Sequence, residues 1–182
     1  MCGAANEDAL KMEASEFLKA HADTWTARQA PEFAVVNIHS MEIPAPAARI
    51  FPELASRDLL APGAFWKSLL GFRFAVGQIF GWDRAIPAHR PQSFQVGQYF
   101  AFFCVKHVDA PREVSMEVEN RLTRAVMSWL LSEGAGGTTV FNVTCANFKG
   151  RRGRLYWRVI RPFHDGLIEA SLRTLRRRVE MD

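Results

Sequence analysis

The chain has 182 residues, which fits one domain with a short appendage. Hydrophobic residues make up 48% of it and charged residues 23%, so disorder is excluded as the main state. The net charge of +4 is mild, and the 14 Phe and 5 Trp residues suit either a dense core or an apolar pocket.

Cysteine usage and the N-terminal sequence indicate a compartment. Cys2, Cys104 and Cys145 are odd in number and lack the CxxC spacing, which argues against a disulfide framework and against a zinc site. The N-terminus has no basic segment followed by an apolar one, as a signal peptide would. No apolar run reaches the roughly 18 residues of a membrane-spanning helix. We therefore expect a cytoplasmic protein without a membrane span.

The N-terminal half predicts helices around one strand. Apolar residues recur at helical spacing over residues 10–25, which predicts an amphipathic helix that packs on the domain or docks a partner. Residues 33–43 are rich in β-branched side chains and predict a strand. Short helices are expected after Pro46 and after Gly63, and residues 77–97 are expected to form an irregular loop.

From Tyr99 onward the pattern changes to strands with short connections, which predicts an antiparallel meander. Residues typical of turns separate these strands at 109–111, 134–137 and 150–153. The last predicted strand carries Leu155, Trp157 and Val159 on one face, with Arg154, Tyr156 and Arg158 on the other.

A long helix from Pro162 to about Val179 is expected to cover the apolar face of this sheet. Its apolar stripe consists of His164, Ile168, Ser171, Leu172, Leu175 and Val179. Glu169 and Arg173 lie outside the stripe at the spacing of a helical ion pair. The fold class is therefore α+β, with a sheet packed on a C-terminal helix.

This order of elements resembles the helix-grip fold of the START-like (SRPBCC) superfamily, which includes polyketide cyclases and birch-pollen-type allergens. Three stretches are similar to a bacterial family of unknown function within it. They are His39-Ser-Met-Glu-Ile-Pro-Ala-Pro46 leading into Ile50-Phe51, the segment Phe65-Trp66 to Phe72-Arg73, and Gly153-Arg-Leu-Tyr156 continuing to Pro162-Phe-His164. The resemblance implies a curved antiparallel sheet gripping the long helix over residues 32–182, with residues 1–31 as an N-terminal helical extension. The superfamily's implied role is to hold a hydrophobic small molecule between sheet and helix.

A binding site is expected where adaptable Met and aromatic side chains converge on the inner face of the sheet and meet the helix. The candidate ligand-binding residues are Met116, Met127, Trp129, Phe141, Trp157, His164, Ile168 and Leu172. The same side chains could equally fill the core without leaving a cavity. His164 is either a polar anchor or proton donor in the cavity, or a hydrogen-bonded residue that fixes the strand–helix corner.

Other kinds of site find no support. The five histidines show no spacing of a known metal motif, so neither a metal nor another cofactor is expected. Arginine clusters at 151–154 and 173–178 could attract nucleic acid or an anionic membrane. A turn and a helix C-terminus are ordinary places for solvated cations, so we expect no nucleic-acid partner.

The preferred hypothesis is a domain that binds a hydrophobic small molecule in a cavity between the sheet and the C-terminal helix. One alternative is a cyclase- or hydrolase-like enzyme that uses the same cavity, with His164 or His107 as acid or base. Another is a protein-interaction module whose N-terminal helix docks a partner.

Overall fold

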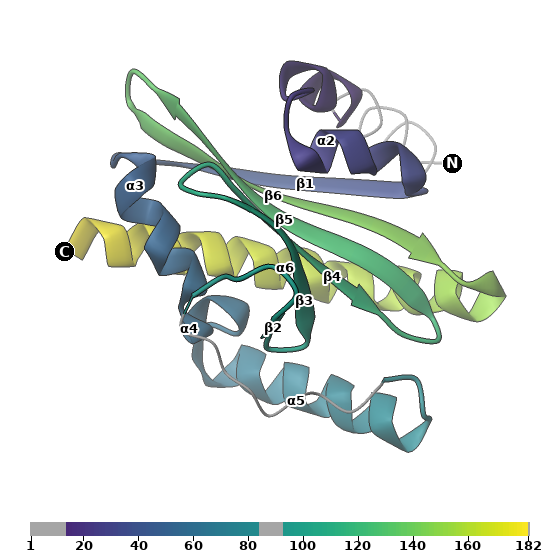
Figure 1. Cartoon of the computed structure of the whole chain (residues 1–182). Helices are drawn as coiled ribbons and strands as arrows, with labels where there is room; N and C mark the ends of the chain where they lie inside the picture. Colours follow the sequence, from purple (N-terminus) through teal and green to yellow (C-terminus); the bar gives the residue numbers. More distant parts are fainter. Residues whose placement is uncertain (1–13, 84–92, 182) are drawn as a thin grey trace, which may run out of the picture.

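The computed structural model describes residues 14–83 and 93–181, the side chains of residues 57 and 58 excepted. Six antiparallel strands form one open sheet in the order β1-β6-β5-β4-β3-β2 (Figure 1). The strands are β1 Val35–Ile43, β2 Tyr99–Phe100, β3 Phe103–Asp109, β4 Glu113–Glu119, β5 Thr123–Gly134 and β6 Gly137–Phe148. The helices are residues 14–20, α2 Trp25–Gln29, η1 Ala30–Glu32, α3 Ala47–Ile50, η2 Phe51–Ala55, α4 Arg57–Leu60, α5 Gly63–Ile79 and α6 Gly150–Met181.

The inner face of the sheet packs on α6, because alternate strand residues are apolar there. Met116 pairs across the strands with Met127, and both belong to the main core cluster together with Trp129. Ile168 and Leu172 of α6 are buried in the same cluster. Burial of each large apolar side chain contributes about 1.5–3 kcal/mol. The expected α+β arrangement, a sheet on a C-terminal helix, is confirmed.

The outer face of the sheet is covered by the N-terminal segment. A second core cluster contains Phe33, Val143 and Cys145 of this face, and the ring of Phe17 lies 4.8 Å from that of Phe141. The single helix expected over residues 10–25 is wrong, because the helix through residue 20 ends and α2 begins anew after Thr24. The Thr24 hydroxyl caps α2 by accepting the backbone N–H of Ala27. Residues 10–13 lie outside the described ranges.

The largest correction concerns residues 150–161, which were expected to form a turn and a strand. They form the first third of α6, and Pro162, expected to begin the helix, lies inside it. Leu155 and Val159 are therefore one helical turn apart and exposed, and do not share the face of a strand. Arg154, Tyr156 and Arg158 likewise form no row.

Two glycines explain why this segment turns into a helix. Gly150 has φ of +65°, a left-handed conformation that lets the chain leave β6 and enter α6. At Gly153 an added Cβ would lie 2.5 Å from the Leu122 carbonyl oxygen, so only glycine allows α6 to approach the sheet this closely. Gly150 and Gly153, which were expected to form a turn between two strands, instead allow the start of α6 to pack against the sheet.

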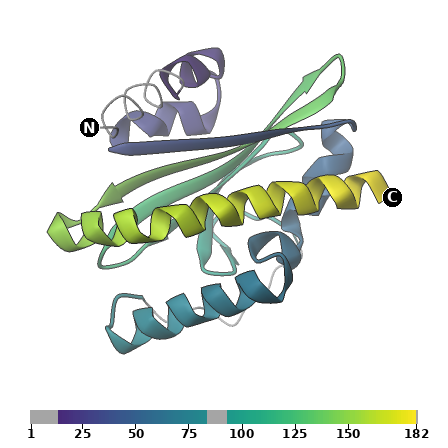
Figure 2. The same cartoon turned by 180° about the vertical axis from the view of Figure 1, so that it is seen from behind.

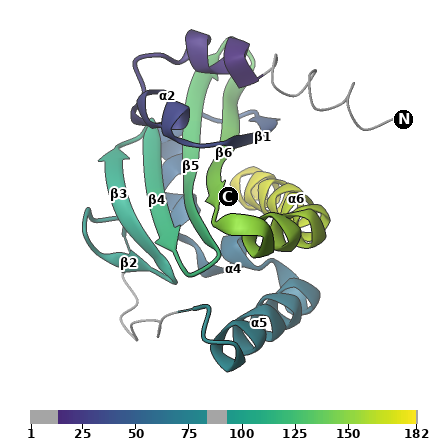
Figure 3. The same ribbon diagram turned by 90° about the vertical axis from the view of Figure 1, so that its right-hand side faces the viewer.

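Helix α5 lies beside α6 on the inner side of the sheet and runs in the opposite direction (Figure 2). Figure 3 shows α5 set apart from the strands, and among the elements of residues 14–83 and 93–181 none lies on its outer side. The Arg73 Nε–H donates to the Tyr156 hydroxyl at 3.0 Å and joins the two helices. In the described part of the chain, no helix is both long and apolar enough to cross a membrane.

Two substitutions in neighbouring positions of α6 test how this helix docks. Ile168 is buried, and Ile168→Asp should lower the free energy of unfolding by more than about 3 kcal/mol, since it removes core packing and buries an unpaired carboxylate. Glu169 forms the expected ion pair with Arg173 at 3.0 Å on the exposed side. Glu169→Gln should cost at most about 0.5 kcal/mol. Thermal and urea unfolding of both variants measures the difference, and similar midpoints would contradict this packing.

Candidate functional site

A cavity of about 460 Å³ lies between the inner face of the sheet, α5 and α6. Its apolar lining includes Trp66, Leu70 and Phe74 of α5, Met127 and Trp129 of β5, and Trp157, Ile160 and Ile168 of α6. This volume falls in the range of about 300–1,000 Å³ that is typical of small-molecule sites. The cavity exists because α5 covers a space that α6 and the sheet leave open between them.

A cluster of polar side chains stands at the wall formed by β1, β6 and α6. Asp165 Oδ1 accepts a hydrogen bond from Asn37 Nδ2 at 2.7 Å and lies 3.3 Å from both His39 Nε2 and His164 Nδ1. Asp165 Oδ2 lies 3.6 Å from Arg161 Nε. Two histidines therefore share one carboxylate oxygen, and only His164 also lines the cavity.

The far nitrogen of His164 faces a hydroxyl on the cavity wall. His164 Nε2 lies 3.4 Å from Thr144 Oγ1, which also lies 3.3 Å from Asn142 Oδ1. The hydroxyl has one hydrogen, so it donates either to His164 Nε2 or to Asn142. When Nδ1–H donates to Asp165 in the neutral ring, Nε2 is the acceptor and Thr144 can donate to it. In this tautomer the Asp165 carboxylate leaves Nε2 of His164 as the nitrogen that can accept a hydrogen bond or a proton at the cavity wall.

The carboxyl of Asp165 is held in its charged form. Burial alone would raise its pKa, but hydrogen bonds from His164 and Asn37 and the charges of His164 and His39 outweigh this effect. They lower the pKa of Asp165 from 3.8 to about 2. A carboxylate that stays ionised beside two imidazoles can accept a hydrogen bond from each ring and so orient both.

A second polar cluster borders the cavity where α5 meets α6. Arg73 forms an ion pair with Asp83 and donates to the Tyr156 hydroxyl. Asp83 Oδ1 in turn accepts a hydrogen bond from Asn120 Nδ2 at 2.9 Å. All four side chains line the cavity and come from four different parts of the chain. This cluster ties α5 to the rest of the domain.

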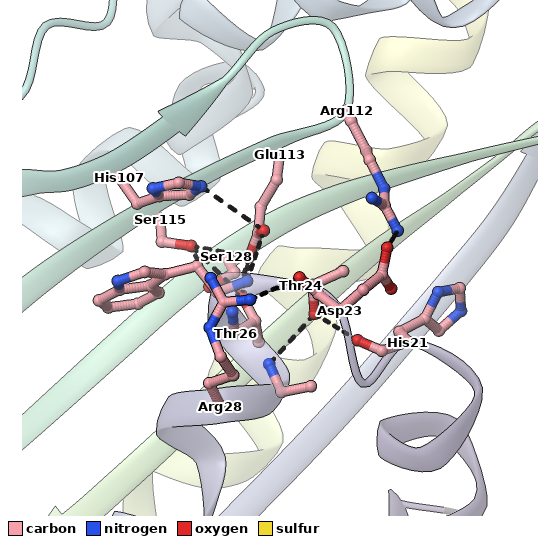
Figure 4. Close-up of polar contacts among 12 residues, drawn as sticks. His21, Asp23, Thr24, Thr26, Arg28, His107, Arg112, Glu113, Ser115 and Ser128 are labelled. Carbon is pink, nitrogen blue, oxygen red and sulfur yellow. Dashed lines mark hydrogen bonds and ion pairs between the residues drawn. The ribbon is translucent and has the colours of Figure 1, made fainter.

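The opposite face of the sheet carries a separate polar network (Figure 4). Glu113 is 1% exposed, and its carboxylate accepts the backbone N–H groups of Trp25 at 2.9 Å and Thr26 at 2.8 Å. Ser115 and His107 complete its surroundings, the latter with Nε2 at 3.8 Å. The network holds the N-terminus of α2 on the sheet. His107 therefore faces away from the cavity, and its suggested role as acid or base there is wrong.

The candidate ligand-binding residues divide into three groups. Met127, Trp129, Trp157, His164 and Ile168 line the cavity. Met116 and Leu172 are buried in the adjoining core and do not reach its surface.

The prediction that Phe141 lines the binding site is wrong. Phe141 lies on the outer face, where it packs against Phe17 and His21, because β6 places even-numbered residues such as Thr144 toward the cavity.

The sequence reasoning missed most polar members of the site. Arg73 and Asp83 lie in the expected helix and in the loop after it, and nothing in their spacing links them to Tyr156. Asp165 stands directly beside His164, and His39 opens one of the stretches that carry the family resemblance. The positions of Asp165 and His39 in the sequence were therefore the two features that could have indicated this cluster. Within residues 14–83 and 93–181, no group of three His, Cys, Asp or Glu side chains is placed to hold a metal ion.

Replacement of the shared carboxylate tests its electrostatic role. Because the native pKa of Asp165 lies below its ordinary value, its ionised form stabilises the fold above about pH 4, and this contribution is lost as the pH falls toward about 2. Asp165→Asn should therefore be less stable than the wild type at neutral pH. The difference should narrow over that acidic window. Urea unfolding across a pH series measures it, with far-UV circular dichroism to verify folding, and a difference independent of pH would contradict the assignment.

Comparisons with solved structures confirm the fold. A protein from Rhizobium leguminosarum is 14% identical, with a TM-score of 0.52 over 81% of this chain and 95% of that one. A protein from Mycobacterium smegmatis is 12% identical, with a TM-score of 0.51 over 80% and 91%. A protein from Arthrobacter aurescens is 10% identical, with a TM-score of 0.53 over 82% and 88%. At these identities the likeness concerns the fold alone.

No curated protein matches the chain. A family model described as "Protein of unknown function (DUF2867)" matches residues 29–171. That range begins in α2 and ends in α6, so it includes the whole sheet and both polar clusters. The chain therefore belongs to the DUF2867 family.

Proposed function

We propose that the chain binds an apolar small molecule in the cavity between the sheet, α5 and α6. The observation that carries this proposal is the cavity itself, about 460 Å³ in volume and walled mainly by aromatic and aliphatic side chains. Solid packing of the same side chains is the usual outcome in a protein interior, where voids larger than a water molecule are few. A cavity of this size with converging polar groups is typical of a ligand site.

The polar groups narrow the ligand class. His164 and Thr144 offer hydrogen-bonding atoms at one wall, and Arg73 and Tyr156 offer a cation and a hydroxyl at another. The ligand we propose has an apolar body that the indole rings contact and at least one oxygen function that reaches one of these walls. A few polar atoms that converge on a mostly apolar cavity can fix the orientation of a ligand's polar group, which favours such a ligand over a pure hydrocarbon.

We further propose that the family is a branch of the START-like superfamily. The open antiparallel sheet, the long C-terminal helix across its inner face and the cavity between them support this placement. Because one architecture hosts many functions, the placement adds weight to a binding role without identifying the ligand.

Occupation of the cavity can be tested in two steps. Native mass spectrometry of freshly purified protein should reveal a co-purified small molecule. The uncharged fluorophore prodan should then bind the emptied protein with a blue-shifted emission. Ala125 lines the cavity, and Ala125→Phe should fill part of it and weaken prodan binding by about tenfold or more while the protein stays folded.

Phe141→Leu is the matched control, because Phe141 lies on the outer face of the sheet. It should lower the melting temperature slightly and leave prodan affinity unchanged. Equal affinities of the wild type and Ala125→Phe would contradict binding in this cavity.

An enzymatic role is the second candidate, and one observation favours it. His164 has one nitrogen at the cavity wall and the other beside Asp165, as in the pairs that enzymes use to move protons. In such a reaction His164 would take or give the proton, and Asp165 would position the ring. The interaction-module alternative receives less support, since Phe17, Leu18 and Trp25 pack on the domain itself.

A panel of p-nitrophenyl esters with apolar acyl chains tests this candidate. If His164 acts as a base, ester hydrolysis should exceed the buffer rate and fall by about a hundredfold or more in His164→Gln. Asp165→Asn should lower kcat and change its pH profile while leaving KM similar. Hydrolysis that is unaffected by His164→Gln would contradict a catalytic role for this residue in that reaction.

A further inference from the structure

Helix α5 is apolar on both its inner and its outer side. Its sequence contains Lys67 and Arg73 but no Asp or Glu. Trp66, Leu70 and Phe74 face the cavity, whereas Phe65, Phe72 and Ile79 are 66%, 68% and 79% exposed. These last three are seven residues apart and share one side of the helix. A surface helix normally carries polar residues on the side opposite its apolar inner face, whereas α5 carries these three large apolar side chains there.

The exposed apolar surface continues from α5 onto the first half of α6. Leu155, Val159 and Phe163 are 61%, 60% and 45% exposed. Val159 and Phe163 follow the same stripe of α6 as Tyr156 and Gly166, which contact α5. An added Cβ at Gly166 would lie 3.0 Å from the Trp66 indole, so the two helices approach closely there. Figures 2 and 3 show both helices on the same side of the sheet.

The charges beside this surface all have one sign. Arg151, Arg152, Arg154 and Arg158 are exposed on the first half of α6, and none has an ion-pair partner within the described ranges. The sequence has no Asp or Glu between residues 150 and 164.

The second half of α6 differs. There Arg173 pairs with Glu169 at 3.0 Å and Arg176 with Glu180 at 2.7 Å. Within the described ranges, unpaired arginines are thus concentrated beside the exposed apolar residues, although Arg161 on the first half is paired with Asp165 and Arg177 on the second half has no ion-pair partner.

We propose that this α5–α6 surface docks on an anionic lipid bilayer. The six exposed apolar residues would enter the boundary between headgroups and acyl chains, and the four arginines would contact the anionic headgroups. The combination of unpaired cations with a neighbouring apolar stripe complements such a bilayer on both counts. The inference does not depend on whether the cavity holds a ligand.

Vesicle flotation with the full chain tests the proposal. The wild type should bind vesicles of mixed phosphatidylcholine and phosphatidylglycerol at least about tenfold more tightly than vesicles of phosphatidylcholine alone. Binding should weaken as salt rises, because the arginines are exposed. Arg154→Glu/Arg158→Glu and Phe72→Ser/Ile79→Ser should each reduce affinity for the anionic vesicles by about tenfold or more. These side chains are exposed, so both variants should remain folded by circular dichroism.

Arg173→Glu/Arg176→Glu is the control, because it changes the net charge equally on the half of α6 that carries ion pairs. It should retain most of the binding. A Trp at position 72, introduced by Phe72→Trp, should shift its emission to the blue on anionic vesicles and be quenched by brominated lipid. Absence of vesicle binding at low salt would overturn the proposal, as would equal losses in the control variant. Binding of duplex DNA without vesicle binding, or a dimer that Phe72→Ser/Ile79→Ser abolishes, would assign the surface to another partner and also overturn it.

Discussion

The contact between α6 and the inner face of the sheet determines the rest of the structure. The residues of α6 that are buried lie in two regions of the helix. At its start, Gly153 lies against the Leu122 carbonyl, and in its second half Ile168, Leu172 and Leu175 are buried. Between these regions the indole of Trp157 stacks on Phe148 and the ring of His164 faces Thr144, and both rings also line the cavity. The cavity therefore lies along the less buried middle of α6, between the helix and the sheet, with α5 as its outer wall.

The two polar clusters connect different elements of the packed sheet and helices. The Asp165 cluster joins α6 to β1, a strand that is paired with β6 along its whole length. The Arg73 cluster joins α5, in which Gly77 is the one fully buried residue, to the turn after β4 and to α6. The first cluster is suited to hold a group of a ligand in one orientation. The second is the principal polar tie of a weakly packed helix, so movement of α5 would have to break it.

Much of the architecture could be predicted from the sequence, because it depends on periodic burial. The stripe from Ile168 to Val179 and the turn at residues 134–137 follow from spacing and glycine alone. Residues 150–161 could not be placed this way. Leu155, Trp157 and Val159 alternate like a strand, and only the contact of Gly153 with Leu122 shows why a helix forms instead.

The candidate site was predictable in its apolar part only. Met127 and Trp129 stand at alternating positions of one strand, so their common face follows from its period. Phe141 was assigned to that face although the register of β6 places it on the other. The polar groups depend on tertiary contacts, as between Asn37 and Asp165, which lie 128 residues apart. A pattern within a short stretch of sequence cannot predict a contact between residues so far apart in the chain.

The burial of Glu113 beneath α2 bears on how this protein can be divided. Its carboxylate has most of its hydrogen bonds from Trp25 and Thr26, both of which precede the first strand. A shorter chain that began at β1 would keep the whole sheet and α6 but would expose this carboxylate together with the apolar outer faces of β5 and β6. In such a fragment the outer face of the sheet would be exposed, charged and apolar, and so prone to aggregation, whereas in the full chain the N-terminal segment covers it. A shortened form of this protein, expressed alone or in a fusion, would therefore need to begin before α2 in order to fold independently.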